Sequence, residues 1–296
     1  MSIQSLFKIV KKHITQKPSN GDIYTKYSSL TREQNISKKW LVLSFDCDTP
    51  PDAEAAEEIA DRLKQMGITA VFAVPGKSLE GLQYSYKQLV ESGFEFINHG
   101  YSDHAAFNTE KNEYYGITWY HEMTEEEVRR DIRDAHECII KILGISPKGF
   151  RAPHFGYFQK SRQLEIIYSE IARLGYTYAT TTMPEFGLIK GAVFPVSRNL
   201  FEFPLTGTFD NPRILLDSWQ FLAAPERVFD DDDYIVQFKK MVDFFSNNDL
   251  PCILNFYADP SHVINFRGFF ECIDYACQSG IEITTYSRII SILKGN

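Results

Sequence analysis

The chain of 296 residues lacks any apolar run long enough to cross a bilayer, and no signal peptide is recognisable at its N-terminus. It is also short of positive charge, because 31 Lys and Arg stand against 39 Asp and Glu, and this balance argues against general nucleic-acid binding. Its five cysteines are odd in number and scattered, a pattern typical of reduced core thiols and not of a disulfide framework. We therefore expect a cytoplasmic protein with no nucleic-acid partner.

Residues 1–38 differ in composition from the rest of the chain. Between residues 3 and 14, apolar residues recur at helical spacing with lysines on the other side, which predicts a short basic amphipathic helix. We expect it to pack on the body of the protein, because one short helix binds membrane weakly without a second anchor. Residues 17–37 read as a linker. The sequence thus predicts a helix and linker over 1–38, with weak contact between 1–17 and the inner face of a membrane as an alternative, and one domain over 39–296.

From Trp40 onward, strand-like and helix-like segments alternate, which predicts an α/β fold with a parallel sheet, closed or open. In either architecture the functional groups gather at the C-terminal ends of the strands. A long loop is expected between His99 and Met123. The acidic run Asp230–Asp233 indicates a helix N-terminus rather than a metal site, because carboxylates favour the positive end of the helix dipole. Strands are expected near 40–47, 69–74, 94–98, 148–152, 176–181, 200–203, 251–257 and 281–284, and helices near 52–66, 79–92, 124–143, 161–174, 234–247, 265–279 and from 286.

Two carboxylates, Asp46 and Asp48, end the first expected strand. In an extended strand alternate side chains share a face, so the two carboxylates lie side by side while Cys47 takes the other face. A cation or a shared proton relieves their repulsion, so the pair indicates a metal site or an acid/base site. The alternative is a turn residue followed by a helix N-cap, since Asp is common before prolines and helices.

Two imidazoles, His99 and His104, follow the third expected strand, with Asp103 between them. They fall at the same end of the sheet as the Asp pair. One carboxylate and two His form a plausible three-ligand set for a hydrolytic zinc or similar ion, which leaves positions open for water and substrate. A bound cation lowers the pKa of its water and polarises a carbonyl oxygen.

Three segments follow one another along the chain: Ser44–Asp48 with its Asp pair, Asn98–His104 with its two His, and Phe150–Phe155 with Arg151 two residues before a proline. Together they resemble the motifs of the polysaccharide deacetylase superfamily, the NodB-homology domain of the carbohydrate esterases. Two later segments, Leu174–Tyr176 and Phe201–Pro204, look like further motifs of that family. The resemblance covers about residues 40–290, and it implies a distorted (β/α) barrel of the polysaccharide-deacetylase type.

The His pair departs from the family's spacing. The family's second metal-binding His follows the first by four residues, and here Asp103 occupies that position while His104 comes one later. Because residues i and i+5 lie on different faces of a helical turn, either Asp103 is the third ligand or a local insertion brings His104 round. We favour His104, since a neutral imidazole adds no further negative charge around the metal.

The general acid is a second departure. The family's fifth motif supplies a His, and here Asp259 stands in the corresponding place with His262 close by. His262 could replace the missing acid, with His154 as a weaker choice, or it could cap the following helix. The acidic residues of the fourth motif are replaced by three Thr at 180–182, although Asp210 lies downstream.

The resemblance implies a hydrolase that removes an N-acyl, acetyl-like group from a sugar, in surface-polysaccharide or glycan-precursor biosynthesis. Its partner would be an N-acylated sugar or glycan precursor, and its cofactor one divalent metal ion, zinc by preference. The expected catalytic residues are Asp46 as base, Arg151 orienting that base and His262 as acid, and the expected metal ligands are Asp48, His99 and His104. Candidates for stacking on a sugar ring are Tyr101, Tyr157 and Trp219.

Two other functions stay open. Hydrolysis of a non-sugar linear or cyclic amide, as in allantoinase-like relatives, would use the same groups. A catalytically degenerate barrel that binds a glycan or a metal without turnover would account for the altered fourth and fifth motifs.

Overall fold

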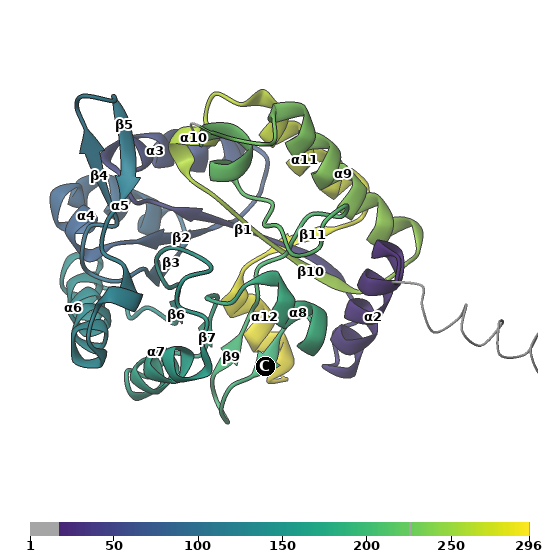
Figure 1. Cartoon of the computed structure of the whole chain (residues 1–296), viewed down its shortest axis with the longest axis horizontal. Helices are drawn as coiled ribbons and strands as arrows, with labels where there is room; N and C mark the ends of the chain where they lie inside the picture. The colour runs from purple at the N-terminus through teal and green to yellow at the C-terminus, as the bar shows by residue number, and fades with distance from the viewer. Residues whose placement is uncertain (1–17, 225, 296) are drawn as a thin grey trace, which may run out of the picture.

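The computed structural model describes residues 18–224 and 226–295, which fold around one curled sheet (Figure 1). Its strands run in the order β10-β1-β2-β3-β6-β7-β9-β8, with β11 also paired to β1, and only the β8–β9 pair is antiparallel. The expected parallel sheet is therefore confirmed. The strands are β1 (Lys39–Asp46), β2 (Val71–Val74), β3 (Glu95–Asn98), β6 (Gly149–Phe150), β7 (Tyr178–Ala179), β8 (Phe194–Pro195), β9 (Phe201–Glu202), β10 (Cys252–Ala258) and β11 (Glu282–Thr284).

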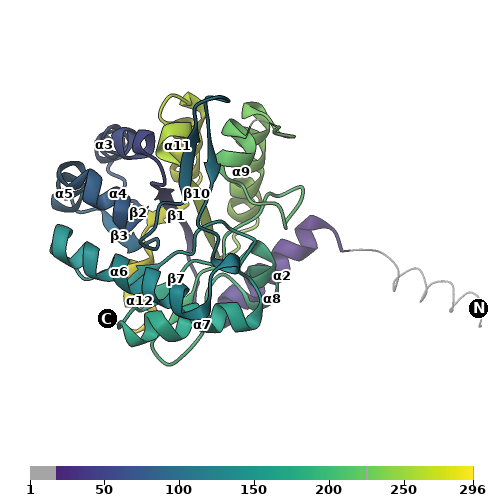
Figure 2. The same ribbon diagram turned by 60° about the vertical axis from the view of Figure 1, so that its left-hand side comes forward.

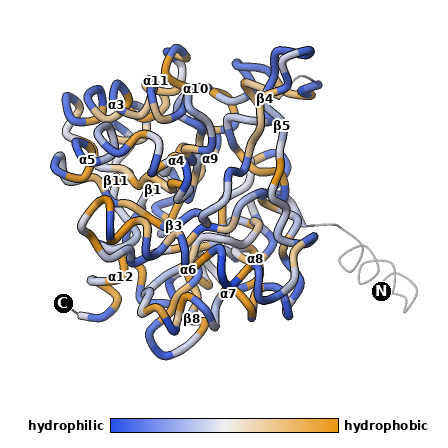
Figure 3. The backbone as a smooth tube through the Cα atoms, turned by 90° about the vertical axis from the view of Figure 1, so that its left-hand side faces the viewer, coloured by the Kyte–Doolittle hydropathy of each residue, from blue (hydrophilic) through white to orange (hydrophobic). Residues whose placement is uncertain are grey.

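Helices cover the outside of the sheet (Figure 2). Hydrophobic and hydrophilic residues alternate along them, as in helices with one buried face (Figure 3). In α6 the capping box of Thr124 and Glu127 sets the start, and Gly144, at φ 69°, provides the left-handed residue that ends it. The larger helices are α3 (Pro50–Gln65), α6 (Glu125–Leu143), α7 (Ser161–Arg173), α9 (Asp231–Asn247), α11 (Arg267–Gln278) and α12 (Tyr286–Leu293), and the shorter α8 (Pro184–Lys190) and α10 (Pro260–Val263) lie between strands.

A seam separates the two ends of the curled sheet. β10 forms one edge, and the segment that follows β9 faces it. Thr206 N donates to Asn255 O at 3.0 Å, and Asn255 N donates to Thr206 Oγ1 at 2.9 Å. These bonds, and not a strand ladder, join the edges, so the barrel is distorted.

The linker expected over residues 17–37 is wrong, because α2 (Asn20–Glu33) occupies most of it. Ser19 caps this helix, and Tyr24 and Tyr27 lie buried on one face. Tyr27 OH donates to Ile253 O at 2.7 Å, which attaches the helix to the start of β10. Pro18 directly precedes the cap and Gly21 lies in the first turn, so neither residue interrupts the helix. The basic helix expected between residues 3 and 14 lies outside the described residues.

Two other connections differ from expectation. The helix expected over 79–92 is divided into α4 (Gly76–Gly81) and α5 (Gln83–Glu91), because Leu82 leaves the helical region with φ −130° and ψ 41°. The long loop expected after His99 contains a hairpin of β4 (Ala105–Asn108) and β5 (Glu113–Gly116). Neither strand of the hairpin is fully buried, so its sequence lacks the apolar run that marks the other strands.

The acidic run before α9 behaves as expected. Asp230 is the N-cap and forms a capping box with Asp233. Within residues 18–224 and 226–295, no helix combines the length and the apolar character needed to span a membrane.

Candidate active site

A hollow of about 460 Å³ opens at the C-terminal ends of β1, β3 and β10. A volume of this size is typical of small-molecule sites held by a few polar groups. Five of the six residues expected in the site line it, namely Asp46, Asp48, His99, His104 and His262, and the sixth, Arg151, is buried and bonded to Asp46.

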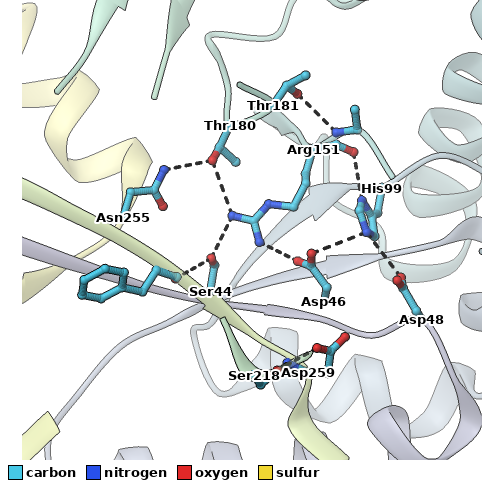
Figure 4. A network of polar contacts seen from close by, with 12 residues as sticks. Ser44, Asp46, Asp48, His99, Arg151, Thr180, Thr181, Ser218, Asn255 and Asp259 are labelled. Atoms are coloured by element: carbon cyan, nitrogen blue, oxygen red, sulfur yellow. Dashed lines mark hydrogen bonds and ion pairs between the residues drawn. The ribbon is translucent and has the colours of Figure 1, made fainter. Parts of the chain in front are cut away.

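Asp46 is the last residue of β1 and is almost completely buried. Its Oδ1 accepts a hydrogen bond from Nη1 of Arg151 (Figure 4). Burial raises the pKa of Asp46, and the opposing charge of Arg151 does not cancel that rise. A carboxylate with a raised pKa takes up a proton more readily, while the guanidinium fixes its orientation.

Arg151 is held by groups from distant parts of the chain. Its Nη2 donates to Ser44 Oγ at 2.8 Å and to Tyr286 OH at 3.0 Å. Tyr286 OH in turn donates to Asn255 Oδ1 at 2.6 Å. Sequence reasoning missed Tyr286 and Asn255, because Tyr286 lies 135 residues from Arg151 and no motif links them.

Asp48, His99 and His104 each offer one ligand atom, and these atoms all lie within 4.8 Å of one another. His99 Nδ1–H donates to Arg151 O at 2.9 Å, so Nε2 is the nitrogen that faces Asp48 Oδ1, 3.3 Å away. His104 Nδ1 lies 3.1 Å from the same oxygen. Burial raises the pKa of Asp48, but the two imidazoles outweigh it and hold that pKa well below its usual range. One carboxylate oxygen and two imidazole nitrogens suit a zinc-like divalent ion, so the donor set fits a metal.

The structure distinguishes His104 from Asp103. The His104 side chain is buried against Asp48, whereas the Asp103 carboxylate is half-exposed and lies 3.5 Å from Lys77 Nζ. The longer spacing therefore brings the imidazole, and not the carboxylate, beside the other two donors.

On another wall of the hollow, His262 forms a compact group with Asp259 and Ser218. His262 Nδ1 lies 3.1 Å from Asp259 Oδ2, and Ser218 Oγ donates to that oxygen at 2.7 Å. Burial lowers the pKa of His262, but Asp259 outweighs it, so the net pKa is raised. The ring is thus biased toward its protonated form.

His154, the weaker choice for the acid, lines the hollow, but its imidazole is bound to other groups of the wall. Its Nε2–H donates to Ile117 O at 2.7 Å, and its ring stacks on Trp119 with centroids 4.0 Å apart. Burial lowers the pKa of His154, which disfavours the protonated form that an acid needs. Of the three stacking candidates, Tyr157 (57% exposed) and Trp219 (41% exposed) line the hollow. Tyr101 is not among its lining residues, and its hydroxyl donates to Glu80.

Two further carboxylates of the lining, Asp52 and Asp217, were missed from the sequence. Burial raises the pKa of each to about 7. Asp217 follows two buried leucines and directly precedes Ser218, and an Asp inside such an apolar stretch was the available signal. The downstream candidate Asp210 instead pairs with Lys240 at 2.6 Å and does not line the hollow.

The three Thr at 180–182 are buried, and they support the site rather than enter it. Thr181 N and Thr182 N donate to Glu202 Oε1 at 2.7 Å and 2.8 Å. Glu202 belongs to the segment Phe201–Pro204 that looked like a late family motif, so that segment has a definite structural role.

Comparison with known proteins gives concordant results. The family model for polysaccharide deacetylase matches residues 33–179. A peptidoglycan-N-acetylglucosamine deacetylase of Bacillus cereus is 29% identical over 118 residues, which is 40% of this chain and only 37% of that protein. A Mycobacterium smegmatis structure described as a polysaccharide deacetylase has a TM-score of 0.62 at 16% identity, over 87% of this chain and 91% of its own. Puue allantoinase has a TM-score of 0.60 at 13% identity, over 87% and 90%.

At these identities the two structures establish the fold, and the distorted (β/α) barrel is confirmed. Since the segments that match the family meet in one hollow of a barrel with the family's fold, the chain belongs to the polysaccharide deacetylase superfamily.

Proposed function

We propose that the chain is a metal-dependent hydrolase that removes an N-acyl, acetyl-like group from a sugar. One observation carries this: the buried base Asp46 lies beside a metal-binding donor set, with His99 Nε2 3.7 Å from Asp46 Oδ2 and 3.3 Å from Asp48 Oδ1. A base next to a metal site is what amide hydrolysis by activated water requires. Family membership supports a sugar as the carrier of the amide.

In this proposal Asp48, His99 and His104 hold the ion, zinc by preference, which when bound lowers the pKa of water and polarises the acyl carbonyl. Asp46 takes the proton from the attacking water through the carboxylate that Arg151 orients. The bond from water oxygen to acyl carbon forms, and the bond from that carbon to the sugar nitrogen breaks.

The leaving nitrogen needs a proton, and His262 supplies it. Asp259 engages Nδ1 of His262, so Nε2 is the nitrogen that can give up its proton. The raised pKa of His262 supports this role, because an acid must be protonated at the pH of catalysis.

Substrate and location complete the proposal. The exposed rings of Tyr157 and Trp219 offer apolar faces at the hollow for a sugar of an N-acylated glycan or glycan precursor.

Five free cysteines, four of them buried, support a reducing, cytoplasmic compartment. The biosynthesis of surface polysaccharide or its precursors, and a weak contact of residues 1–17 with a membrane, stay part of the proposal.

The test uses the purified chain, zinc and short N-acetylated amino-sugar chains, with released acetate and free amine measured together. The Asp46→Asn variant should lower kcat by about 10²–10⁴-fold, because it removes the base, while zinc binding persists. As a control, Asp210→Asn changes an acid that does not line the hollow and should leave kcat unchanged.

Other outcomes separate the alternatives. Turnover of linear or cyclic amides without acetate release from sugars would favour the allantoinase-like function. Zinc binding without any turnover would favour a non-catalytic barrel. Absence of zinc binding after reconstitution would refute the metal-dependent reaction.

A further inference from the structure

His99 and His104 are five residues apart, yet both imidazoles reach the same oxygen of Asp48. Their ring centroids are 4.5 Å apart at an interplanar angle of 83°. A helical turn would separate residues at this spacing, so the backbone between them must follow another path. We call residues 99–104 the histidine turn.

The carboxylate of Asp131, on α6, binds the middle of the histidine turn. Its Oδ2 accepts from Tyr101 N at 3.0 Å, and its Oδ1 accepts from Ser102 N at 2.9 Å, so two successive amides share one carboxylate. Ser102 Oγ and Tyr120 OH donate to the same two oxygens at 2.6 Å and 2.8 Å. Asp131 is buried, and four donors compensate its charge.

The opposite side of the turn is held as well. Gly76 N donates to Gly100 O at 2.9 Å, and Lys77 N donates to Tyr101 O at 2.9 Å. Gly100 has φ 82°, and a Cβ there would lie 2.5 Å from Asp131 Oδ2 and 2.8 Å from Tyr120 Oη. The backbone therefore lies directly against the carboxylate, and only glycine fits that approach.

We infer that Asp131 is a positioning residue for the metal site: by binding the amides of Tyr101 and Ser102, it bends the histidine turn so that His104 meets Asp48 despite the extra residue. The C-terminal end of the histidine turn is fixed by a separate bond, since His104 O accepts from Ile117 N at 2.7 Å. Asp131 does not line the hollow, so it acts through the turn and not on the substrate. The inference rests on the proposed function in requiring that the site bind a metal ion.

The Asp131→Asn variant tests this inference, because an amide can accept from only one of the two backbone N–H groups and places its own N–H₂ against the other. Zinc alone is the probe: the metal is removed with a chelator, and the dissociation constant is measured by competition with a chromophoric chelator. We expect zinc binding to weaken about 10–100-fold. The visible spectrum of the cobalt-loaded variant should also change, because it reports the arrangement of the ligands.

Matched variants separate positioning from folding. Asp134→Asn removes an exposed acid from the same helix and should leave zinc affinity unchanged. Ser102→Ala and Tyr120→Phe each remove one bond to Asp131 and should weaken zinc binding several-fold with the metal-free fold retained. If Asp131→Asn does not fold, the zinc affinities of Ser102→Ala and Tyr120→Phe decide whether Asp131 positions the histidine turn.

The inference is overturned if folded Asp131→Asn, or the Ser102→Ala and Tyr120→Phe pair together, binds zinc as tightly as the parent. A parent chain that binds no zinc at all is a different result, since it removes the proposed function itself.

Discussion

Ser218 Oγ lies between the Asp259 carboxylate and the His262 imidazole, 2.7 Å from Asp259 Oδ2 and 3.2 Å from His262 Nδ1. Ser218 Oγ also accepts from Asp259 N at 2.8 Å, so the hydroxyl fixes the position of the Asp. Asp259 in turn favours the protonated form of His262. The acid proposed for this chain is thus a cooperative group of three residues rather than a single imidazole.

The Asp259→Asn variant should move the alkaline limb of the kcat–pH profile to lower pH. Asp259 raises the pKa of His262, so removing its charge lowers that pKa, and the ring loses its proton at a lower pH. The acid form of His262 is the active one, and the limb should move by about 1 pH unit. Acetate release at saturating substrate across the pH range measures this.

Ser218→Ala is the matched control, because it keeps the charge of Asp259 and should move the limb less. An alkaline limb at the same pH in Asp259→Asn and the parent would exclude His262 as the proton donor.

Single residues differ in how far the sequence could identify them. Asp46, Asp48 and His99 could be found because each stands at or just after the end of an apolar strand, the edge at which the functional groups of a parallel sheet gather. Asp131 and Tyr286 could not, because each lies on an amphipathic helix where a polar residue is ordinary. Their importance comes from packing between elements that are remote in the sequence.

Among the helices, α2 is the part of the fold that the sequence least revealed. Its mean composition is polar, and its buried residues are Tyr24, Tyr27, Ser28 and Thr31. The hydroxyls of the first three donate to backbone carbonyls outside the helix. Ser28 Oγ donates to Pro251 O at 2.9 Å, next to the start of β10. Periodicity of apolar residues could not disclose a helix that is attached through hydroxyl groups.

Tyr27→Phe should therefore lower the free energy of unfolding by about 1–3 kcal/mol, because Ile253 O loses its buried donor from α2 while the ring stays packed. Urea unfolding followed by circular dichroism measures the change. Zinc affinity should be unaffected, since Tyr27 does not line the hollow.

Tyr115→Phe, at a half-exposed tyrosine of the hairpin, is the control and should change stability by less than about 0.5 kcal/mol. Equal stability of Tyr27→Phe and the parent would mean that the hydroxyl bond to β10 contributes nothing net.

The donor set combines Asp48, which follows β1, with His99 and His104 of the histidine turn, which follows β3, so it exists only in the folded chain. Zinc that binds the folded chain and not the unfolded one should raise Tm with zinc concentration. The expected gain is about 2.7 kcal/mol at a hundredfold excess over Kd. Differential scanning calorimetry with and without chelator measures it, and His104→Ala should abolish the zinc-dependent part.

A Tm that is independent of zinc in the parent would count against the site. A zinc-dependent Tm that survives in His104→Ala would point to ligands other than those proposed.

The seam between β10 and the segment after β9 has a consequence for where function is encoded. Asn255 Nδ2 donates to Pro204 O and to Thr180 Oγ1, each at 3.0 Å, so one side chain ties both edges of the sheet together and also accepts from Tyr286, the residue that holds Arg151. The stretch 33–179 that carries the family match contains Asp46 and the candidate metal donors but none of the residues that close the seam. The family match therefore lies in residues 33–179, whereas the residues that close the seam, and through Tyr286 hold Arg151 beside Asp46, lie C-terminal to it.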